Sequence, residues 1–175
     1  MSASVPLMAG KKGLIMGVAN ERSLAWGIAR ALAEQGAELA FTYQGEALEK
    51  RVVPLAARAG SEIVMPCDVS DPGSIDAAMA TVGEKLGRLD FLVHAIAYSD
   101  REQLSGRYID TTPDNFAMSL NISCYSFTAV CQRAERLLSD TASLLTLSYA
   151  GAERVMPHYN VMGVAKAALE ASVRY

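Results

Sequence analysis

Short apolar runs alternate along the chain with longer segments whose apolar residues recur at helical spacing. The runs are apolar at consecutive positions, which is typical of strands buried on both faces of a parallel sheet. Five strands are predicted, at residues 13–17, 39–43, 63–67, 91–96 and 143–148. Helices are predicted to begin near Leu24, Ala47, Pro72 and Pro113, and a last helix follows Pro157.

The spacing within two of these helices predicts which residues they bury. In the first, Leu24, Ile28 and Ala31 share one stripe, and Gly36 marks its end. The helix after Thr112 is expected to run unbroken to about Leu138. Its apolar residues are Phe116, Leu120, Tyr125, Phe127 and Val130.

Strands that alternate with helices favour a parallel sheet covered by helices on both faces. The fold class is therefore α/β, a doubly wound parallel sheet in three α/β/α layers. No linker, repeat or change of composition divides the sequence, so residues 1–175 are predicted to form one domain. A polar stretch at residues 98–112 is long for a connection and is a candidate functional loop.

Composition excludes several classes of protein. The chain has 175 residues, of which 51% are hydrophobic, and a formal net charge of −3, which argues against a chain-wide surface for nucleic acid. No apolar run reaches the roughly 18 residues of a membrane span, so no membrane insertion is expected. Cys67, Cys124 and Cys131 fit neither a disulfide framework nor a metal site. We expect a reduced, cytoplasmic protein.

The turn after the first strand has the features of a phosphate-binding site. Gly17 permits an unusual backbone angle, Ser23 can cap the following helix, and Gly27 could allow that helix to approach the strand closely. Free N–H groups at the helix start would favour a diphosphate. This pattern is typical of a Rossmann-type fold, although the spacing is not GxGxxG and an ordinary capped helix is as good an explanation.

Other candidate residues stand where the predicted strands end. Asp68 and Val69 follow the third strand, and Ile96 ends the fourth. Gln44 ends the second, where an acidic residue often selects NAD over NADP. No acid stands there, so these residues alone leave NADH and NADPH open.

The densest chemistry lies near the C-terminal end. Tyr159 and Lys166 are seven residues apart, close to two helical turns, so they are predicted to share a helix face. A phenol beside an ammonium can donate a hydrogen bond to a developing oxyanion. Tyr149 leaves the fifth strand at the same edge of the sheet. The three together favour a catalytic site over isolated structural residues.

These motifs resemble those of the short-chain dehydrogenase/reductase superfamily, and within it the divergent branch of bacterial enoyl-[acyl-carrier-protein] reductases. The superfamily usually places its lysine four residues after the tyrosine, where this chain has Gly163. The reductase branch shares the Tyr-x6-Lys spacing and the Gly-x5-Ser turn. It also shares the segments at residues 41–44 and 147–154.

The resemblance implies reduction, by NADH, of the trans-2 double bond of an enoyl thioester on acyl carrier protein, in fatty acid biosynthesis. It implies that Tyr159 hydrogen-bonds the enolate, Lys166 holds the nicotinamide ribose and Tyr149 lies against the substrate. The positions matching cofactor contacts are Gly17, Ser23, Leu24, Gln44, Asp68, Val69, Ile96 and Lys166. Ser99 matches a substrate contact where alanine is common.

Two further expectations follow from the resemblance. Helices like that from Phe116 to Leu137 pair between subunits in this superfamily, which implies a homotetramer. The family continues beyond the helix at Tyr175 with two strands and a substrate lid, so the chain is expected to be the front portion of such an enzyme. A related reductase of a carbonyl such as a 3-oxoacyl thioester, or a non-catalytic NAD-binding module, remains an alternative.

Overall fold

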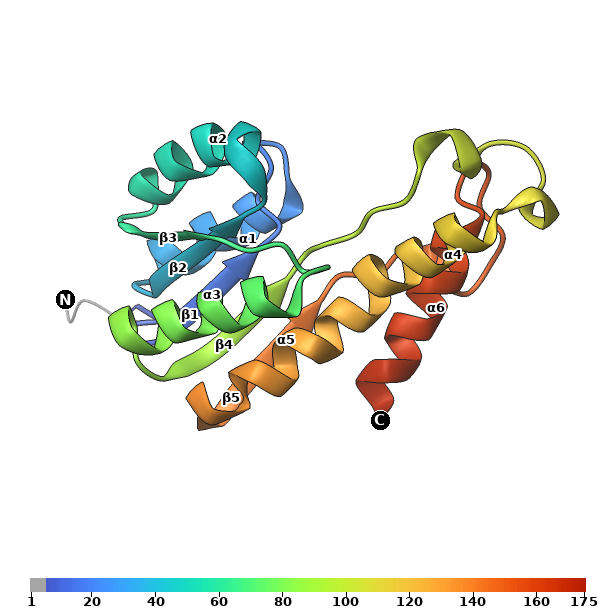
Figure 1. Cartoon of the computed structure of the whole chain (residues 1–175). Helices are drawn as coiled ribbons and strands as arrows, with labels where there is room; N and C mark the ends of the chain where they lie inside the picture. The colour runs from blue at the N-terminus through green and yellow to red at the C-terminus, as the bar shows by residue number, and fades with distance from the viewer. Residues whose placement is uncertain (1–5) are drawn as a thin grey trace. The chain divides into compact units, whose positions relative to one another are not determined.

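The computed structural model describes residues 6–175 and contains a five-stranded sheet in the order β3-β2-β1-β4-β5 (Figure 1). The strands are β1 Lys12–Met16, β2 Glu38–Tyr43, β3 Ile63–Pro66, β4 Leu89–His94 and β5 Leu138–Thr146. Strand β1 pairs in parallel with both β2 and β4, and β2 pairs in parallel with β3. This order is that of a doubly wound sheet, so the predicted Rossmann-type α/β class is confirmed.

Helices connect the strands as predicted, with one change. They are α1 Leu24–Glu34, α2 Gly45–Arg58, α3 Pro72–Lys85, α4 Pro113–Leu120, α5 Ser126–Ala134 and α6 Val161–Arg174. The helix expected to run unbroken to about Leu138 is instead interrupted, because a π-helix, Asn121–Tyr125, separates α4 from α5. Side chains cap the two helices that were predicted to begin near Pro72 and Pro113. Asp71 accepts from the N–H of Gly73, and Thr112 accepts from that of Asn115.

Successive side chains of the central strands point to opposite faces of the sheet, as expected of strands. Ile15, Phe41 and Val93 belong to one buried cluster with residues of α1 and α2. Their neighbours Leu14 and Leu92 are also fully buried, so both faces of the central strands are covered.

Two helices bury faces other than the expected ones. In α1 the buried residues are Ala25, Trp26 and Ala29, whereas Leu24 is 73% exposed. Ala25 and Ala29 are small enough for α1 to lie close to the sheet. The buried face of the helix is therefore shifted by one residue from the predicted face. In the helical stretch after Thr112, Phe116 and Tyr125 are exposed, whereas Phe127 and Val130 are buried.

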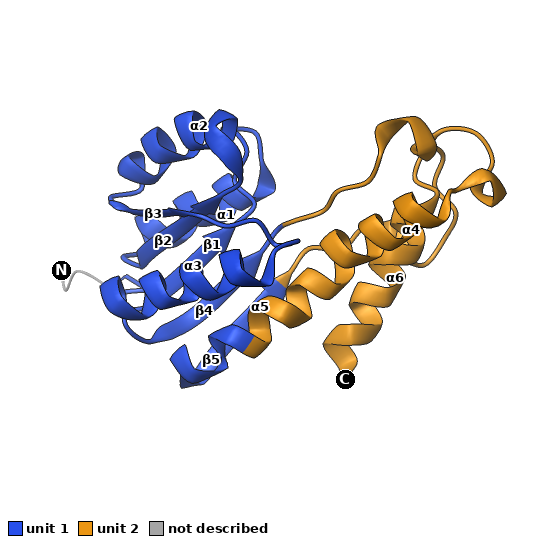
Figure 2. Cartoon of the chain, viewed as in Figure 1, with its two compact units in different colours: residues 1–95, 133–145 blue, residues 96–132, 146–175 orange. Residues whose placement is uncertain are grey.

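The chain forms two compact units, which Figure 2 distinguishes by colour. Unit 1 comprises residues 1–95 and 133–145, with most of the sheet and α1 to α3. Unit 2 comprises residues 96–132 and 146–175, with α4, most of α5, and α6. The single domain expected over residues 1–175 stays a prediction.

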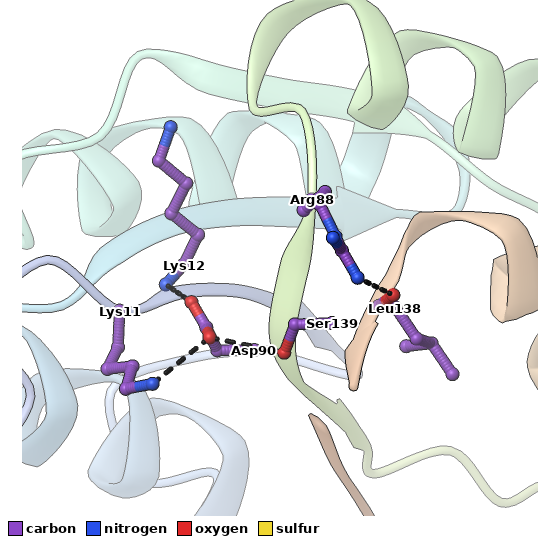
Figure 3. Close-up of polar contacts among 6 residues, drawn as sticks. All are labelled: Lys11, Lys12, Arg88, Asp90, Leu138 and Ser139. Carbon is purple, nitrogen blue, oxygen red and sulfur yellow. Dashed lines mark hydrogen bonds and ion pairs between the residues drawn. The ribbon is translucent and has the colours of Figure 1, made fainter. Parts of the chain in front are cut away.

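Asp90 ties three strands of unit 1 together near the beginning of β1 (Figure 3). Its carboxylate accepts from the backbone N–H of Lys12 on β1 at 3.0 Å and from the hydroxyl of Ser139 on β5 at 3.2 Å. Lys11 adds an ion pair at 3.2 Å. The Lys12 N–H, with help from Lys11 and Ser139, lowers the pKa of Asp90 against the opposing effect of partial burial.

Asp90→Asn is therefore expected to destabilise the protein by about 1 kcal/mol at pH 7. Because the folded pKa lies below the unfolded one, the carboxylate contributes its stability above the unfolded value, near pH 4, and loses it as the pH falls through the folded pKa. Urea unfolding at a series of pH values should show the wild-type and variant curves converging in acid. Asp140→Asn is the control, since that side chain is 98% exposed. A difference that persists at low pH would contradict this role.

Candidate active site

The turn after β1 requires glycine at position 17. The φ angle of Gly17 is +99°, and a Cβ atom there would lie 2.0 Å from the carbonyl oxygen of Ala95. Both the backbone conformation and the lack of space exclude other residues. The unusual backbone angle predicted for Gly17 is confirmed, and the turn passes close to the end of β4.

Ser23 and Gly27 do not act as expected. Ser23 precedes α1, but its side chain makes no cap; its hydroxyl donates to the carbonyl of Asn20 at 2.7 Å and accepts from the N–H of Ala19 at 3.4 Å. The serine therefore shapes the turn and leaves the first N–H groups of α1 without a side-chain cap. Gly27 is exposed, and a Cβ there would meet nothing within 4 Å, so the expected close approach lies at Gly17 instead.

Gln44 and Asp68 come together at the ends of β2 and β3. The amide nitrogen of Gln44 donates to the carboxylate of Asp68 at 3.0 Å, and both the N–H and hydroxyl of Ser70 donate to the same carboxylate. The Ser70 hydrogen bond, the largest cause, and Gln44 lower the pKa of Asp68 despite partial burial. Asp68 is therefore ionised at neutral pH, and Val69 follows it directly, half-buried.

The two candidate catalytic tyrosines are in contact within unit 2. The ring centroids of Tyr149 and Tyr159 are 5.0 Å apart, and the rings meet edge to face at 64°. Burial, followed by the neighbouring Tyr149, raises the pKa of Tyr159 above its usual value. Tyr159 is therefore protonated at neutral pH and can donate a hydrogen bond.

The expectation that Tyr159 and Lys166 share a helix face is wrong. Helix α6 begins at Val161, so Tyr159 lies in the turn before it. Positive φ angles at His158 (+59°) and Asn160 (+37°) prevent the helix from starting earlier.

Tyr159 is instead fixed by two glycines. A Cβ at Gly151 would lie 2.3 Å from the Tyr159 ring, and a Cβ at Gly163 would lie 2.7 Å from the carbonyl oxygen of Gly151. The ring, the turn at residues 150–152 and α6 therefore pack in direct contact. This closeness requires the absence of side chains at both glycines.

Lys166 is buried on α6, with 6% of its surface exposed. Its ammonium donates to the carbonyl of Leu147, just after β5, at 2.7 Å. Burial lowers its pKa. Of its three possible donors, this contact uses one and leaves others that could bind hydroxyls of a ligand.

Ile96 and Ser99 lie in the extended segment that follows β4, and both are half-buried. The hydroxyl of Ser99 faces α4, because it contacts Asn115 at 3.3 Å and Ser119 at 2.9 Å. The structure thus gives Ser99 polar partners within the protein. Its role as a substrate contact stays a prediction.

Sequence reasoning missed Asn160. Its amide donates to the carbonyls of Gln103, at 3.2 Å, and Gly106, at 3.5 Å, and so attaches the turn beside Tyr159 to the polar loop. A cavity of about 420 Å³ opens here, lined by Tyr108, residues 151–156, Tyr159, Asn160, Gly163, Val164 and Ala167. Tyr159 is thus accessible to a small molecule. An asparagine next to a candidate tyrosine was the only signal available in the sequence.

The predicted site residues are divided between the units. Unit 1 holds Gly17, Ser23, Leu24, Gln44, Asp68 and Val69, and unit 2 holds Ile96, Ser99, Tyr149, Tyr159 and Lys166. Within unit 1 the structure brings Gln44 and Asp68 together, and within unit 2 it brings the two tyrosines together.

Comparison with known proteins gives consistent results. The family model for enoyl-(acyl carrier protein) reductase matches residues 17–175. An enoyl-[acyl-carrier-protein] reductase [NADH] of Rhizobium meliloti is 62% identical over 175 residues, which is 100% of this chain and 64% of that protein. A counterpart in Rickettsia bellii is 57% identical over 169 residues, 97% of this chain and 64% of that protein.

Solved structures agree. The crystal structure of the reductase from Anaplasma phagocytophilum in complex with NAD is 57% identical, with a TM-score of 0.94, and the match covers 98% of this chain and 66% of that one. Fold and motifs together define a Rossmann-type protein of the short-chain dehydrogenase/reductase class. More particularly, the chain belongs to the enoyl-(acyl carrier protein) reductase family. It spans 64% of the length of the two relatives compared above.

Within residues 6–175, no helix is long and apolar enough to cross a membrane.

Proposed function

We propose that the protein uses NADH to reduce the trans-2 double bond of an enoyl thioester on acyl carrier protein, a step of fatty acid elongation. The observation that carries the proposal is the position of Tyr159, which lines the 420 Å³ cavity and contacts Tyr149, in a chain of this family. Relatives named as enoyl-[acyl-carrier-protein] reductases [NADH] are 62% identical to it over 175 residues and 57% identical over 169.

The protonated Tyr159 suits the proposed chemistry. When bound, NADH supplies a hydride to the β-carbon of the substrate, and negative charge develops on the thioester oxygen. Tyr159, whose pKa is raised by burial and by Tyr149, donates a hydrogen bond to that oxygen. The α-carbon then takes up a proton that comes from solvent, and we assign to Tyr149, which contacts Tyr159, a part in its transfer.

Each unit by itself carries groups suited to part of a dinucleotide. The Lys166 ammonium is fixed by the Leu147 carbonyl and retains donors for the ribose hydroxyls. At Gly17 the chain has no side chain to obstruct a diphosphate, and the start of α1 lacks a side-chain cap. We assign Ser23, Leu24, Val69 and Ile96 to the remaining cofactor contacts.

Gln44 and Asp68 favour NADH over NADPH. The ionised Asp68 lies within hydrogen-bond distance of Gln44, the position that faces the ribose 2′-hydroxyl in folds of this class. A 2′-phosphate placed there would meet a negative charge.

Asp68→Asn is therefore expected to improve the kcat/KM for NADPH relative to NADH by about fivefold, or ~1 kcal/mol for one charge at a partly exposed site. Steady-state kinetics with both cofactors measure this ratio. Glu62→Gln, which removes an exposed acid before β3, is the control. An unchanged ratio in Asp68→Asn would show that the carboxylate does not select the cofactor.

We further propose a cytoplasmic homotetramer whose macromolecular partner is acyl carrier protein. The exposed Phe116 and Tyr125 on the helices after Thr112 support self-association, because large apolar side chains at a surface commonly mark interfaces. Sedimentation velocity measures the assembly.

The decisive experiment measures NADH oxidation by the protein with a trans-2-enoyl thioester and, separately, with a 3-oxoacyl thioester. Turnover of the enoyl substrate is expected. Turnover of the 3-oxoacyl thioester alone would assign the protein to carbonyl reduction. NADH binding without turnover of either would show a non-catalytic module.

A further inference from the structure

Three buried polar side chains form a stripe along one face of the helix after Thr112. Asn115, Ser119 and Ser123 stand at every fourth position, and their exposed fractions are 3%, 0% and 0%. Burying neutral polar groups is unfavourable unless each is hydrogen-bonded. Each of the three has a hydrogen-bond partner outside its own helix.

All three partners lie in the segment at residues 98–100. The hydroxyl of Ser123 accepts from the N–H of Tyr98 and donates to its carbonyl, both at 2.9 Å. Asn115 accepts from the N–H of Asp100 at 3.0 Å. Ser119 donates to the hydroxyl of Ser99 at 2.9 Å. The stripe thus binds three consecutive residues.

The π-helix Asn121–Tyr125 helps to keep the stripe in line. In an α-helix, residues four apart drift by about 40° around the axis. A π-helix has a wider turn, so the drift from Ser119 to Ser123 is reduced. Ser123 therefore reaches Tyr98, and its Oγ also lies 3.6 Å from Sδ of Met162 on α6.

The hydroxyl of Ser99 is fully used by these contacts. It can donate to the side-chain oxygen of Asn115 at 3.3 Å, and it accepts from the amide of Asn115, at 3.3 Å, and from Ser119. A hydroxyl has one donor and two acceptor positions. No hydrogen-bonding capacity is left for a ligand.

We propose that Asn115, Ser119 and Ser123 are positioning residues that fix the segment 98–100 for the acyl thioester. Ser99 then contacts the substrate through its shape alone, as an alanine would. The proposal rests on the proposed function, because the predicted substrate contact is Ser99. Beyond that function, Asn115, Ser119 and Ser123 hold Ser99 in place, and Ser99 recognises the substrate by its shape.

Hydrogen exchange tests the attachment without any need for activity. In Ser123→Ala, the N–H of Tyr98 loses its acceptor, and its exchange is expected to accelerate about tenfold. Asn115→Ala should have the corresponding effect on the N–H of Asp100. Thr81→Ala is the matched control, because that hydroxyl donates to the carbonyl of Ala77 within α3. Unchanged exchange in both stripe variants would overturn the proposal.

Kinetics test the consequence for the substrate. Ser123→Ala and Asn115→Ala are expected to raise the KM for an enoyl thioester about tenfold and to change the KM for NADH less than about twofold. A merely structural role would impair both. If Ser123→Ala does not fold, Asn115→Ala decides the question. Equal changes in both KM values, or none, would overturn the role in substrate binding.

The pair of serines gives a sharper test of Ser99. Ser99→Ala leaves the buried Ser119 hydroxyl without its acceptor, and a rise in enoyl-thioester KM of about fivefold is expected. Adding Ser119→Ala removes the unpaired hydroxyl, so the double variant should recover part of the loss. The remainder reflects the Asn115 amide, which also loses Ser99 as an acceptor. If Ser99 donates to the substrate instead, the double variant will not recover. A wild-type protein that binds NADH but reduces no enoyl thioester would reject the proposed function, and hydrogen exchange would still decide the attachment.

Discussion

Tyr159→Phe is expected to lower the turnover of an enoyl thioester by about 100- to 1,000-fold. The phenylalanine keeps the edge-to-face contact with Tyr149 and the packing against Gly151, so the fold and NADH binding should be unchanged. Only the hydrogen bond to the developing charge is lost. Steady-state kinetics, together with NADH titration by fluorescence, measure the two effects separately.

The pH dependence adds an independent check on Tyr159. Because its pKa is raised above the usual value near 10, the phenol stays protonated through the neutral and mildly alkaline range. Its ionisation should therefore cause no marked loss of turnover below about pH 9. Tyr175→Phe, at a fully exposed tyrosine, is the matched control. Equal activity in Tyr159→Phe and Tyr175→Phe would remove Tyr159 from the mechanism.

The fold was predictable because its signals are local. Apolar runs placed four strands to within two residues, and Pro72 and Pro113 marked two helix starts. The fifth strand begins at Leu138, five residues before the predicted start. The faces of α1 and α4 were less predictable. Which residue lies inward depends on how closely a helix approaches its neighbours, and Leu24 and Phe116 have no local feature that reveals their exposure.

The candidate site was predictable as a set of residues but not as an arrangement. The sequence indicated Tyr159 and Lys166, yet the helical spacing used to join them fails because α6 begins at Val161. The contacts of Ser99 with Asn115 and Ser119 join residues distant in sequence, so no local pattern announces them. A repeat of small polar residues every fourth position was the one available signal.

Gly163 explains why the lysine of this chain stands seven residues after the tyrosine. In the common superfamily pattern, which the sequence here departs from, a lysine occupies the position of Gly163. Here a Cβ at that position would lie 2.7 Å from the carbonyl oxygen of Gly151. The turn at residues 150–152 therefore occupies the space that such a lysine needs. Lys166, nearly one helical turn further along α6, supplies the ammonium instead.

Gly163→Ala is accordingly expected to destabilise the protein by about 1–3 kcal/mol, the usual cost of overpacking, since the contact is with backbone that cannot rotate away. Turnover should fall as well, because the displaced turn carries Gly151, on which the Tyr159 ring packs. The matched control is Gly27→Ala, in an exposed helical position with no neighbour within 4 Å, which should stabilise by about 0.5–1 kcal/mol. Urea unfolding and steady-state kinetics on both variants measure these effects. A Gly163→Ala protein as stable and active as the wild type would show that the turn yields easily, and the spacing of Tyr159 and Lys166 would then need another cause.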